Sequence, residues 1–464
     1  MLLSLSAFAQ TYDLETLVSS AFSNSHELRA LEKEMLKADA QISEARGNAF
    51  PDITISANLA HSFNQFTPFS MPSGEQVSLV DTMFLYGIDP QSNTGRGIYT
   101  LAGTVDHFLG SLGSLSSMPD NSGSLSLTVN QALYAQGKVG IGVRIGSIYQ
   151  SILRCRHREA QLKLRGEITT LFYASVIAQK AVGIRAQALE LAQETHQLAR
   201  VNFSVGSGSE LDTLKSRLYL ETAGVEYQQA SSDLKLSYEV LMLHSGINRD
   251  VSQFSIAGTI PEINFDLTIQ QATERMYKNN PMVNYISASS AIAQEMVSLA
   301  RSDFRPLVYG GLSVSKIGQF DNFRGIGSRD NWFDDQKVYI GLSWNVFSGM
   351  QKMYKLNQAK YDMAVTEITE TQALEGLELQ LKMVYERLVT SRERLKSTES
   401  IVALAQRGYS VANRSFQVGQ ISLIELRNTE LELNKARTAH NATLFAYHSA
   451  LIELKVLMGE HRFE

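Results

Sequence analysis

The chain has 464 residues, a formal net charge of −5 and a pI near 6.0. Because Lys and Arg are not in excess, the composition argues against a nucleic-acid-binding protein. The single cysteine, Cys155, excludes an intrachain disulfide and a cysteine-rich metal cluster. The nine histidines form no zinc-binding motif, so neither a metal site nor a cofactor is predicted. No run of 18 apolar residues is present, which excludes a helical membrane span but not one made of strands.

The first residues resemble the end of a secretory signal. Ala7-Phe8-Ala9 has the small-x-small pattern of a cleavage site, with Gln10 as the mature start. We therefore expect residues 1–9 to be a signal-peptide remnant and the protein to be exported; an ordinary chain end is the alternative.

Residues 10–250 predict a helix, two strands and a long helical hairpin, in that order. Apolar side chains alternate with polar ones in 52–63 and 123–134, as in strands with one buried face. The 66 residues from Lys138 to Phe203 contain no proline, which allows one helix on the order of 100 Å long. The expected helices span 12–47, 138–203 and 209–245.

Residues 251–464 predict the same order of elements. The expected strands span 306–317 and 337–347, and the expected helices span 266–302, 350–416 and 421–459. Every seventh residue from Leu374 to Phe416 is apolar or aromatic, and this heptad spacing predicts a coiled coil.

The two halves are an internal repeat. Gly206 and Gly419 stand in similar segments 213 residues apart, whereas Pro51 and Pro306 stand in similar segments 255 residues apart. The first half therefore carries about 42 additional residues. We place them within 62–122, a stretch rich in Gly, Ser, Pro and Asn, which is typical of a long loop.

Four strands per chain cannot form a closed sheet. In lipid, each unpaired backbone group at an open edge costs several kcal/mol. A membrane-crossing sheet must therefore be shared between subunits, and we infer an oligomeric tube with strands in the membrane and helices in an aqueous compartment.

The sequence resembles the TolC-like outer-membrane efflux proteins over nearly its whole length. The resemblance rests on the twin halves, on the Ala-Arg…Pro segments 45–51 and 300–306, on the turn segments 205–212 and 418–425, and on Asn345-Val346-Phe347-Ser348-Gly349. It implies an α+β membrane protein with duplicated strand–strand–long-helical-hairpin halves. Three chains would share a twelve-stranded transmembrane β-barrel in outer-membrane lipid, with a periplasmic α-barrel of coiled-coil helices.

The resemblance also implies a function. Such a homotrimer is a passive exit duct of a tripartite efflux or type I secretion system and not an enzyme. Its partners are a periplasmic adaptor protein and an inner-membrane pump; it binds no nucleic acid and uses no cofactor. A non-conducting, periplasm-spanning coiled-coil scaffold is the alternative, and a soluble α+β enzyme is a third, less supported by the residues.

The two hairpin turns are the candidate adaptor contacts. In the family these turns form the periplasmic entrance, which corresponds here to Val205, Gly206, Ser207, Val418, Gly419 and Gln420. The alternative is that glycine serves only the geometry of the turn.

Five further residues are candidates for the periplasmic entrance and pore. Family acids that line the entrance correspond to Glu425 and Asn428, so only one of these two positions keeps its charge, and Asp212 matches Glu425 in the first half. For Glu425 and Asp212, a favourable charge in the first turn of a helix is an equal alternative. The gating Tyr and Arg of the family correspond to Phe416 and Ile421, which predicts apolar closure rather than an ion-pair lock.

Aromatic residues lie within the predicted second-half strands. Trp344, Tyr339, Tyr309 and Phe347 would form either an interfacial girdle or part of a protein core.

Overall fold

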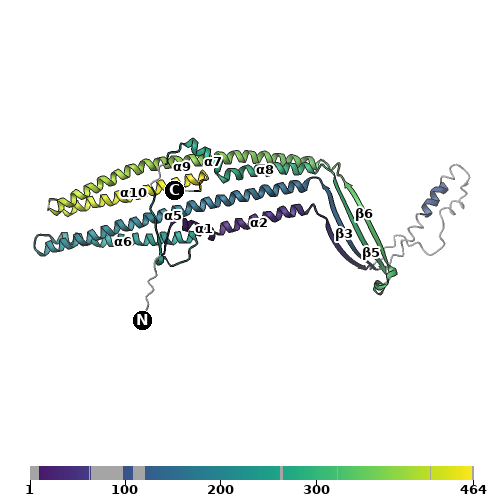
Figure 1. Cartoon of the computed structure of the whole chain (residues 1–464), viewed down its shortest axis with the longest axis horizontal. Helices are drawn as coiled ribbons and strands as arrows, with labels where there is room; N and C mark the ends of the chain where they lie inside the picture. The colour runs from purple at the N-terminus through teal and green to yellow at the C-terminus, as the bar shows by residue number, and fades with distance from the viewer. Residues whose placement is uncertain are drawn as a thin grey trace. The chain divides into compact units, whose positions relative to one another are not determined.

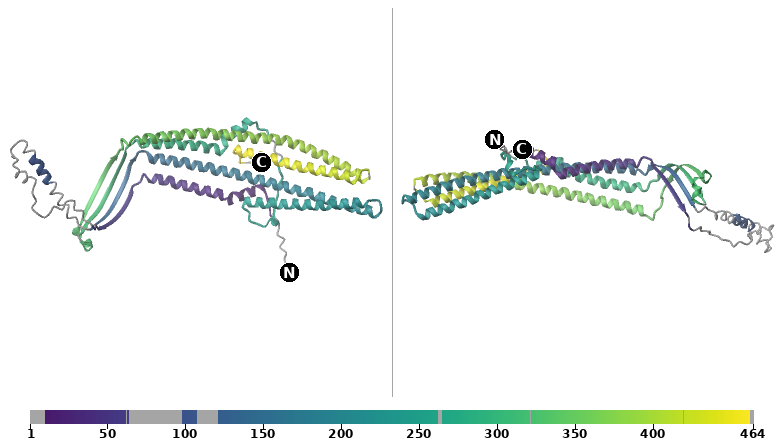
Figure 2. Two further views of the ribbon diagram at one scale, coloured as in Figure 1. Left: turned by 180° about the vertical axis from the view of Figure 1, so that it is seen from behind. Right: turned by 90° about the horizontal axis from the view of Figure 1, so that it is seen from below.

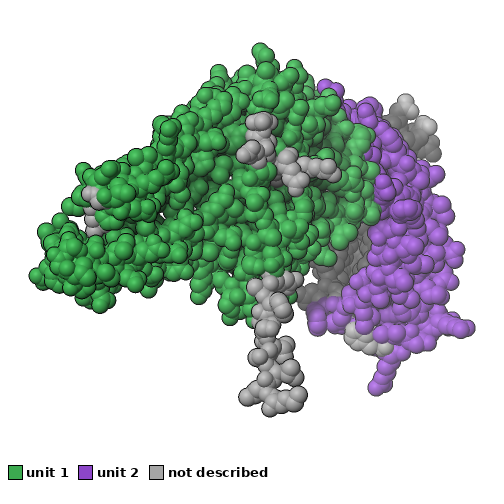
Figure 3. All heavy atoms as spheres, turned by 60° about the vertical axis from the view of Figure 1, so that its left-hand side comes forward, with its two compact units in different colours: residues 1–43, 141–300, 351–464 green, residues 44–140, 301–350 purple. Residues whose placement is uncertain are grey.

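Residues 10–61, 63, 98–107, 121–261, 265–320, 322–418 and 420–461 are described by the computed structural model. The predicted signal remnant and most of the predicted loop at 64–122 lie outside these residues. The chain splits into two compact units (Figure 3), and both contain segments of both sequence repeats. Unit 1 comprises Met1–Ser43, Ile141–Ala300 and Gln351–Glu464, and unit 2 comprises Glu44–Gly140 and Arg301–Met350.

The first repeat supplies unit 1 with one long helical hairpin (Figure 1). Its elements are β1 (Gln10–Tyr12), α1 (Leu14–Asn24), α2 (His26–Gly47), α5 (Lys138–Ser204) and α6 (Glu210–Ser245). The connection to the second repeat contains the 3₁₀ helix η2 (Val251–Gln253) and β4 (Phe254–Ile256), and β4 pairs in parallel with β1.

The second repeat supplies the other hairpin. Its helices are α7 (Ile269–Asn279), α8 (Pro281–Ser302), α9 (Gln351–Gln417) and α10 (Leu423–Leu457). The long helices α5 and α9 each have 67 residues. The two hairpins lie side by side (Figures 1 and 2). Among the described residues, no helix combines the length and the apolar character needed to cross a membrane.

The helices expected at 12–47 and 266–302 are each broken in two, which corrects the prediction. The first break is at Ser25 and the second at Asn280, both in extended backbone. Pro281 disfavours helical backbone at Asn280, and the Asn280 side chain compensates by accepting from the Met282 N–H (2.8 Å). Ser25 Oγ accepts from the Leu28 N–H (3.3 Å) and so restarts the helix as a cap.

At each break, an asparagine side chain is hydrogen-bonded to the C-terminal end of the returning helix of the same repeat. Asn280 Nδ2 donates to the Leu457 carbonyl (2.8 Å) near the end of α10. Asn24 Nδ2 donates to the carbonyl of Gly246 (3.4 Å), which caps α6. Around these joints lie two hydrophobic cores, one containing Leu17, Phe172 and Leu241 and the other Met276, Leu388 and Leu454.

The heptad stripe predicted in α9 lies on the buried side of the helix. Leu381 and Leu388 of this stripe are at most 3% exposed. The residues three positions after a stripe residue, which form the second position of the seam, are also buried at Val384, Ser391 and Ala412. The remaining stripe residues from Leu374 to Phe416 are half-buried, whereas most residues between them are exposed. This arrangement is the expected packing of a coiled-coil seam.

Unit 2 is built on a four-stranded antiparallel sheet. Its strands are β2 (Asp52–His61), β3 (Asn121–Ala135), β5 (Leu307–Phe320) and β6 (Trp332–Ser343), in the order β2-β3-β5-β6. The 3₁₀ helices η3 (Phe323–Gly327) and η4 (Arg329–Asn331) follow β5. The central β3–β5 pair joins the two repeats, and β2 and β6 are the edges.

The strand register separates a mainly apolar face of the sheet, which also carries the Lys316–Asp334 ion pair, from a polar face. The row Ile53–Val129–Leu312–Val338 crosses all four strands on one face, and Ile53 and Val338 are 64% and 81% exposed. The neighbouring row Thr54–Thr128–Ser313–Lys337 lies on the other face. The apolar face also carries Ile55, Leu59, Leu125, Leu127, Val314, Ile340 and Leu342.

The last strand begins earlier and ends earlier than the predicted 337–347. It starts at Trp332 and ends at Ser343, so Trp344 and Phe347 follow the sheet. Trp344 Nε1 donates to the Phe304 carbonyl (3.1 Å), and the chain then turns through positive φ at Gly349 and Met350. The apolar alternation therefore continues beyond the backbone pairing that defines the strand.

Candidate functional site

The first hairpin turn connects α5 to α6 in five residues. Gly206 has a φ of +73°, which only glycine adopts readily, and its N–H donates to the Phe203 carbonyl (3.1 Å). The N–H groups of Ser207 and Gly208 both donate to the Asn202 carbonyl (2.9 Å). Ser209 then caps α6 by accepting from the Asp212 N–H (3.1 Å).

The second turn begins α10 with a capping box. Ser422 Oγ accepts from the Glu425 N–H (3.3 Å), and Glu425 Oε2 accepts from the Ser422 N–H (2.9 Å). Of the predicted adaptor contacts, Val205 and Val418 are each 70% exposed. Gly206, Ser207 and Gln420 also lie in the turns, whereas Gly419 lies outside the described residues.

Both candidate entrance acids are held by helix-cap hydrogen bonds. Asp212 Oδ2 accepts from Ser209 Oγ (2.7 Å), which parallels the Ser422–Glu425 pair in the other hairpin. Glu425 is exposed and Asp212 is half-buried. The carboxylates thus stabilise the start of each returning helix and keep negative charge beside each turn.

The other predicted entrance residues are spread along the second hairpin. Phe416 lies in the last turn of α9 and Ile421 lies in the connection, and both are half-buried. Asn428 is exposed on α10.

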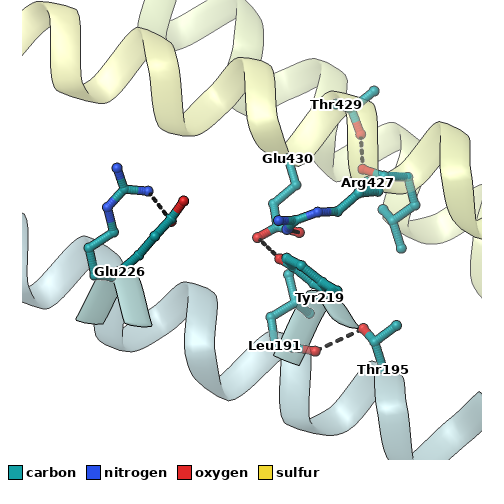
Figure 4. Close-up of polar contacts among 9 residues, drawn as sticks. Leu191, Thr195, Tyr219, Glu226, Arg427, Thr429 and Glu430 are labelled. Atoms are coloured by element: carbon teal, nitrogen blue, oxygen red, sulfur yellow. Dashed lines mark hydrogen bonds and ion pairs between the residues drawn. The ribbon is translucent and has the colours of Figure 1, made fainter. Parts of the chain in front are cut away.

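The two hairpins meet through a polar cluster that the sequence did not reveal. Figure 4 shows Arg427 and Glu430 extending from α10 toward Tyr219 on α6. Tyr219 donates its hydroxyl to Glu430 Oε1 (2.5 Å), and Arg427 Nη1 donates to Glu430 Oε2 (2.9 Å). The Arg427 guanidinium also lies over the Tyr219 ring, 2.9 Å from its centroid. We call Tyr219, Arg427 and Glu430 the latch.

Glu430 is a buried acid, with only 5% of its surface exposed. Burial raises the pKa of its carboxyl to about 7, and the Arg427 charge opposes that rise. Burial also lowers the pKa of Arg427, whose guanidinium nevertheless stays charged at neutral pH. The latch therefore contains a carboxyl that takes up or releases a proton close to neutral pH.

A pocket of about 200 Å³ lies beside the latch, between α5, α6 and α10. Leu191, Ile424 and Leu426 give it apolar walls, and Asp212 and Lys215 contribute its remaining charged groups. Among the described residues, no group of three His, Cys, Asp or Glu side chains could hold a metal ion. The contacts of Tyr219 with Arg427 and Glu430 join α6 of one hairpin to α10 of the other.

Comparison with solved structures shows the same fold in membrane channels. CusC, studied for transmembrane channel formation, has a TM-score of 0.73 at 13% identity over 98% of this chain and 93% of its own. The Campylobacter jejuni CmeC outer membrane channel has a TM-score of 0.73 at 15% identity, covering 96% of this chain and 85% of its own. The Vibrio cholerae outer membrane protein VceC has a TM-score of 0.70 at 15% identity, covering 97% of each chain.

A family model described as outer membrane efflux protein matches residues 17–246 and 272–460, which is most of the chain. No curated protein sequence gives a significant match. The expected TolC-like resemblance is thereby confirmed. The chain belongs to the outer membrane efflux protein family, a family of outer-membrane channels rather than enzymes.

Proposed function

We propose that three copies of this chain form a passive outer-membrane channel of a tripartite efflux system. The observation that carries the proposal is the sheet of unit 2, which exposes an apolar face, has a polar opposite face and leaves both edge strands available for pairing. Pairing β6 of one copy with β2 of the next would satisfy the backbone groups of both edges and direct the apolar face to lipid.

The helical hairpins would extend this channel into the periplasm. Each chain would contribute its α5–α6 and α9–α10 hairpins to a shared wall, and the exposed Val205 and Val418 would meet a periplasmic adaptor. The adaptor would in turn join the channel to an inner-membrane pump. Glu425 and Asp212 would line the entrance, where anchored carboxylates favour cations. Type I secretion uses the same architecture, and the partner chains would decide between the two.

Closure of the entrance would depend on the latch. The sequence predicts apolar closure at Phe416 and Ile421, whereas the structure adds a polar contact between the hairpins of one chain through Tyr219, Arg427 and Glu430.

The test is conductance of the purified protein in planar lipid bilayers. We expect a trimer by native mass spectrometry and discrete single-channel currents. The substitution Glu425→Gln should lower the preference of the pore for cations, with Glu432→Gln, an exposed glutamate on the same helix, as its control. Correctly assembled trimers that give no channels under any condition would favour the scaffold function instead.

A further inference from the structure

Two tyrosines cross each other on the polar face of the sheet. Tyr309 on β5 covers Gly341 of β6, and a Cβ built at Gly341 would lie 2.5 Å from Tyr309 Cζ. Tyr339 on β6 covers Gly311 of β5, where a built Cβ would lie 2.6 Å from Tyr339 Cζ. The two ring centroids are 6.3 Å apart, with planes 69° apart. The two glycines thus leave room for an edge-to-face aromatic pair against the backbone.

A carboxylate belongs to the same row of the sheet. Asp52, Asn130, Gly311 and Tyr339 are successive partners across the four strands. The Tyr339 ring reaches across Gly311, so that its hydroxyl contacts Asn130 Oδ1. Directly opposed side chains have Cβ atoms about 5 Å apart, so the exposed Asp52 carboxylate lies one strand beyond the Tyr339 hydroxyl.

The charge around this pair favours a cation. On the polar face of the four strands, the charged residues are Asp52, Asp335 and Lys337. Lys337 Nζ is paired with Asp335 (2.6 Å), which leaves the charge of Asp52 uncompensated on this face. Aromatic rings attract cations through their electron-rich faces, and a nearby carboxylate adds to that attraction.

We propose that Tyr309, Tyr339 and Asp52 form a binding subsite for organic cations, such as aromatic or quaternary amines. This inference rests on the proposed function, because the polar face then lines the pore and three copies surround it. Passing cations would bind there weakly, since the subsite has one ring pair and one exposed carboxylate per chain.

The test measures block of single-channel current by benzyltrimethylammonium, with benzenesulfonate as the matched anion. We expect the cation to reduce the current at concentrations at which the anion has no effect. Tyr339→Leu and Asp52→Asn should each weaken the block about three- to ten-fold. Tyr339→Phe should keep most of it, because the ring is retained. Ser124→Ala, on the same polar face, is the control that should leave the block unchanged.

Two results would overturn the subsite separately from the channel. One is a conducting wild-type protein that both ions block equally or not at all. The other is cation block that Tyr339→Leu and Asp52→Asn leave unaltered in variants that still form trimers. An absence of channels would overturn the proposed function and, with it, the subsite.

Discussion

Glu430 makes the contact between the two hairpins dependent on the protonation of one carboxyl group. Its carboxyl is buried between α6 and α10 and accepts hydrogen bonds from Tyr219 and Arg427. An exposed ion pair of this kind would contribute at most about 1 kcal/mol. Burial makes the pair more consequential, because removal of either partner leaves a charge or a donor without compensation.

Stability should fall as pH rises through the window set by Glu430. Its pKa is raised from 4.5 to about 7 in the folded protein, so the folded state holds more protons than the unfolded state between these values. The contribution of Glu430 to the free energy of unfolding therefore decreases from pH 4.5 to 7 and stays low above that. Glu430→Gln should remove this dependence.

The measurement is the melting temperature of wild type and Glu430→Gln at half-unit steps from pH 4.5 to 8. The difference between the two curves isolates Glu430 from other groups, such as His448, whose pKa burial lowers to about 4. Glu432→Gln is the exposed control on the same helix. A difference curve that is flat across the window would show that the latch carboxyl does not titrate there.

Tyr219 separates the hydrogen bond of the latch from its aromatic contact. Tyr219→Phe keeps the ring beneath Arg427 but removes the donor to Glu430, at a cost of about 1–3 kcal/mol. Tyr219→Leu removes both contacts and should loosen the hairpins further. Hydrogen exchange of the α6 and α10 amides near the latch would report this order; equal exchange in wild type and Tyr219→Leu would contradict it.

Sequence spacing predicts the local contacts of these residues better than the distant ones. The Ser-x-x-Glu spacing of Ser422 and Glu425 matches the capping box, and Glu430 follows Arg427 by one helical turn. Tyr219, by contrast, is 211 residues from Glu430, and no periodicity links the two hairpins at this level. The latch was therefore missed because it depends on tertiary packing.

At the scale of the element, the helix ends repeat as consistently as the helices. Gly246 and Gly459, which follow α6 and α10, both have positive φ, as do Gln136 with Gly137 and Gly349 with Met350 before α5 and α9. Each of these matches is 213 residues apart. The two hairpins thus begin and end their helices at matching residues with positive φ.

Gly459→Ala should destabilise the protein more than Gly206→Ala. Both positions require left-handed backbone, which costs a non-glycine residue about 1–2 kcal/mol. At Gly206 a Cβ would meet nothing within 4 Å, whereas at Gly459 it would lie 2.5 Å from the Asn279 carbonyl oxygen. Thermal unfolding of both variants checks this order, and an equal loss of stability would exclude the predicted clash at the helix joint.

Elements were predictable where one period dominates and less so at their ends. The proline-free heptads of α9 and the alternation in β2 correspond closely to the observed elements. The breaks at Ser25 and Asn280 were missed because the apolar pattern continues across them. Ser25 Oγ accepts from the Leu28 N–H and caps α2, and Asn280 Nδ2 donates to the Leu457 carbonyl of α10. Tyr309 and Tyr339, for which the sequence leaves an interfacial girdle and a protein core as alternatives, lie on the polar face of the sheet.

At the scale of the whole chain, the four-stranded sheet is the part that would require other copies of the chain, because its two edge strands would pair with theirs in the proposed channel. Two repeats contribute two strands each, and the β3–β5 pair joins them into one sheet. The duplication was visible in the sequence, but the two compact units were not, because each unit collects segments from both repeats. Only the cross-repeat pairing of strands shows which residues share a face.

Substitution of two adjacent β5 residues by lysine should have opposite effects on trimer assembly. Val314→Lys adds a charge to the proposed lipid face, where it costs about 2–4 kcal/mol near the bilayer midplane. Ser313→Lys adds the same charge to the polar face and should assemble normally while reducing cation conductance. Trimer yield in outer-membrane fractions and single-channel selectivity are the measurements; normal assembly of Val314→Lys would refute the assignment of the faces.

The equal length of α5 and α9 also restricts how such a gene can change. One residue inserted into or deleted from a long helix would shift its heptad seam relative to the neighbouring helix. It would also displace one hairpin turn along the helix axis relative to the other turn. Tolerated indels should therefore come as whole heptads, matched between both repeats and both arms of each hairpin. Lengthening or shortening the long helices during evolution should therefore be a coordinated event.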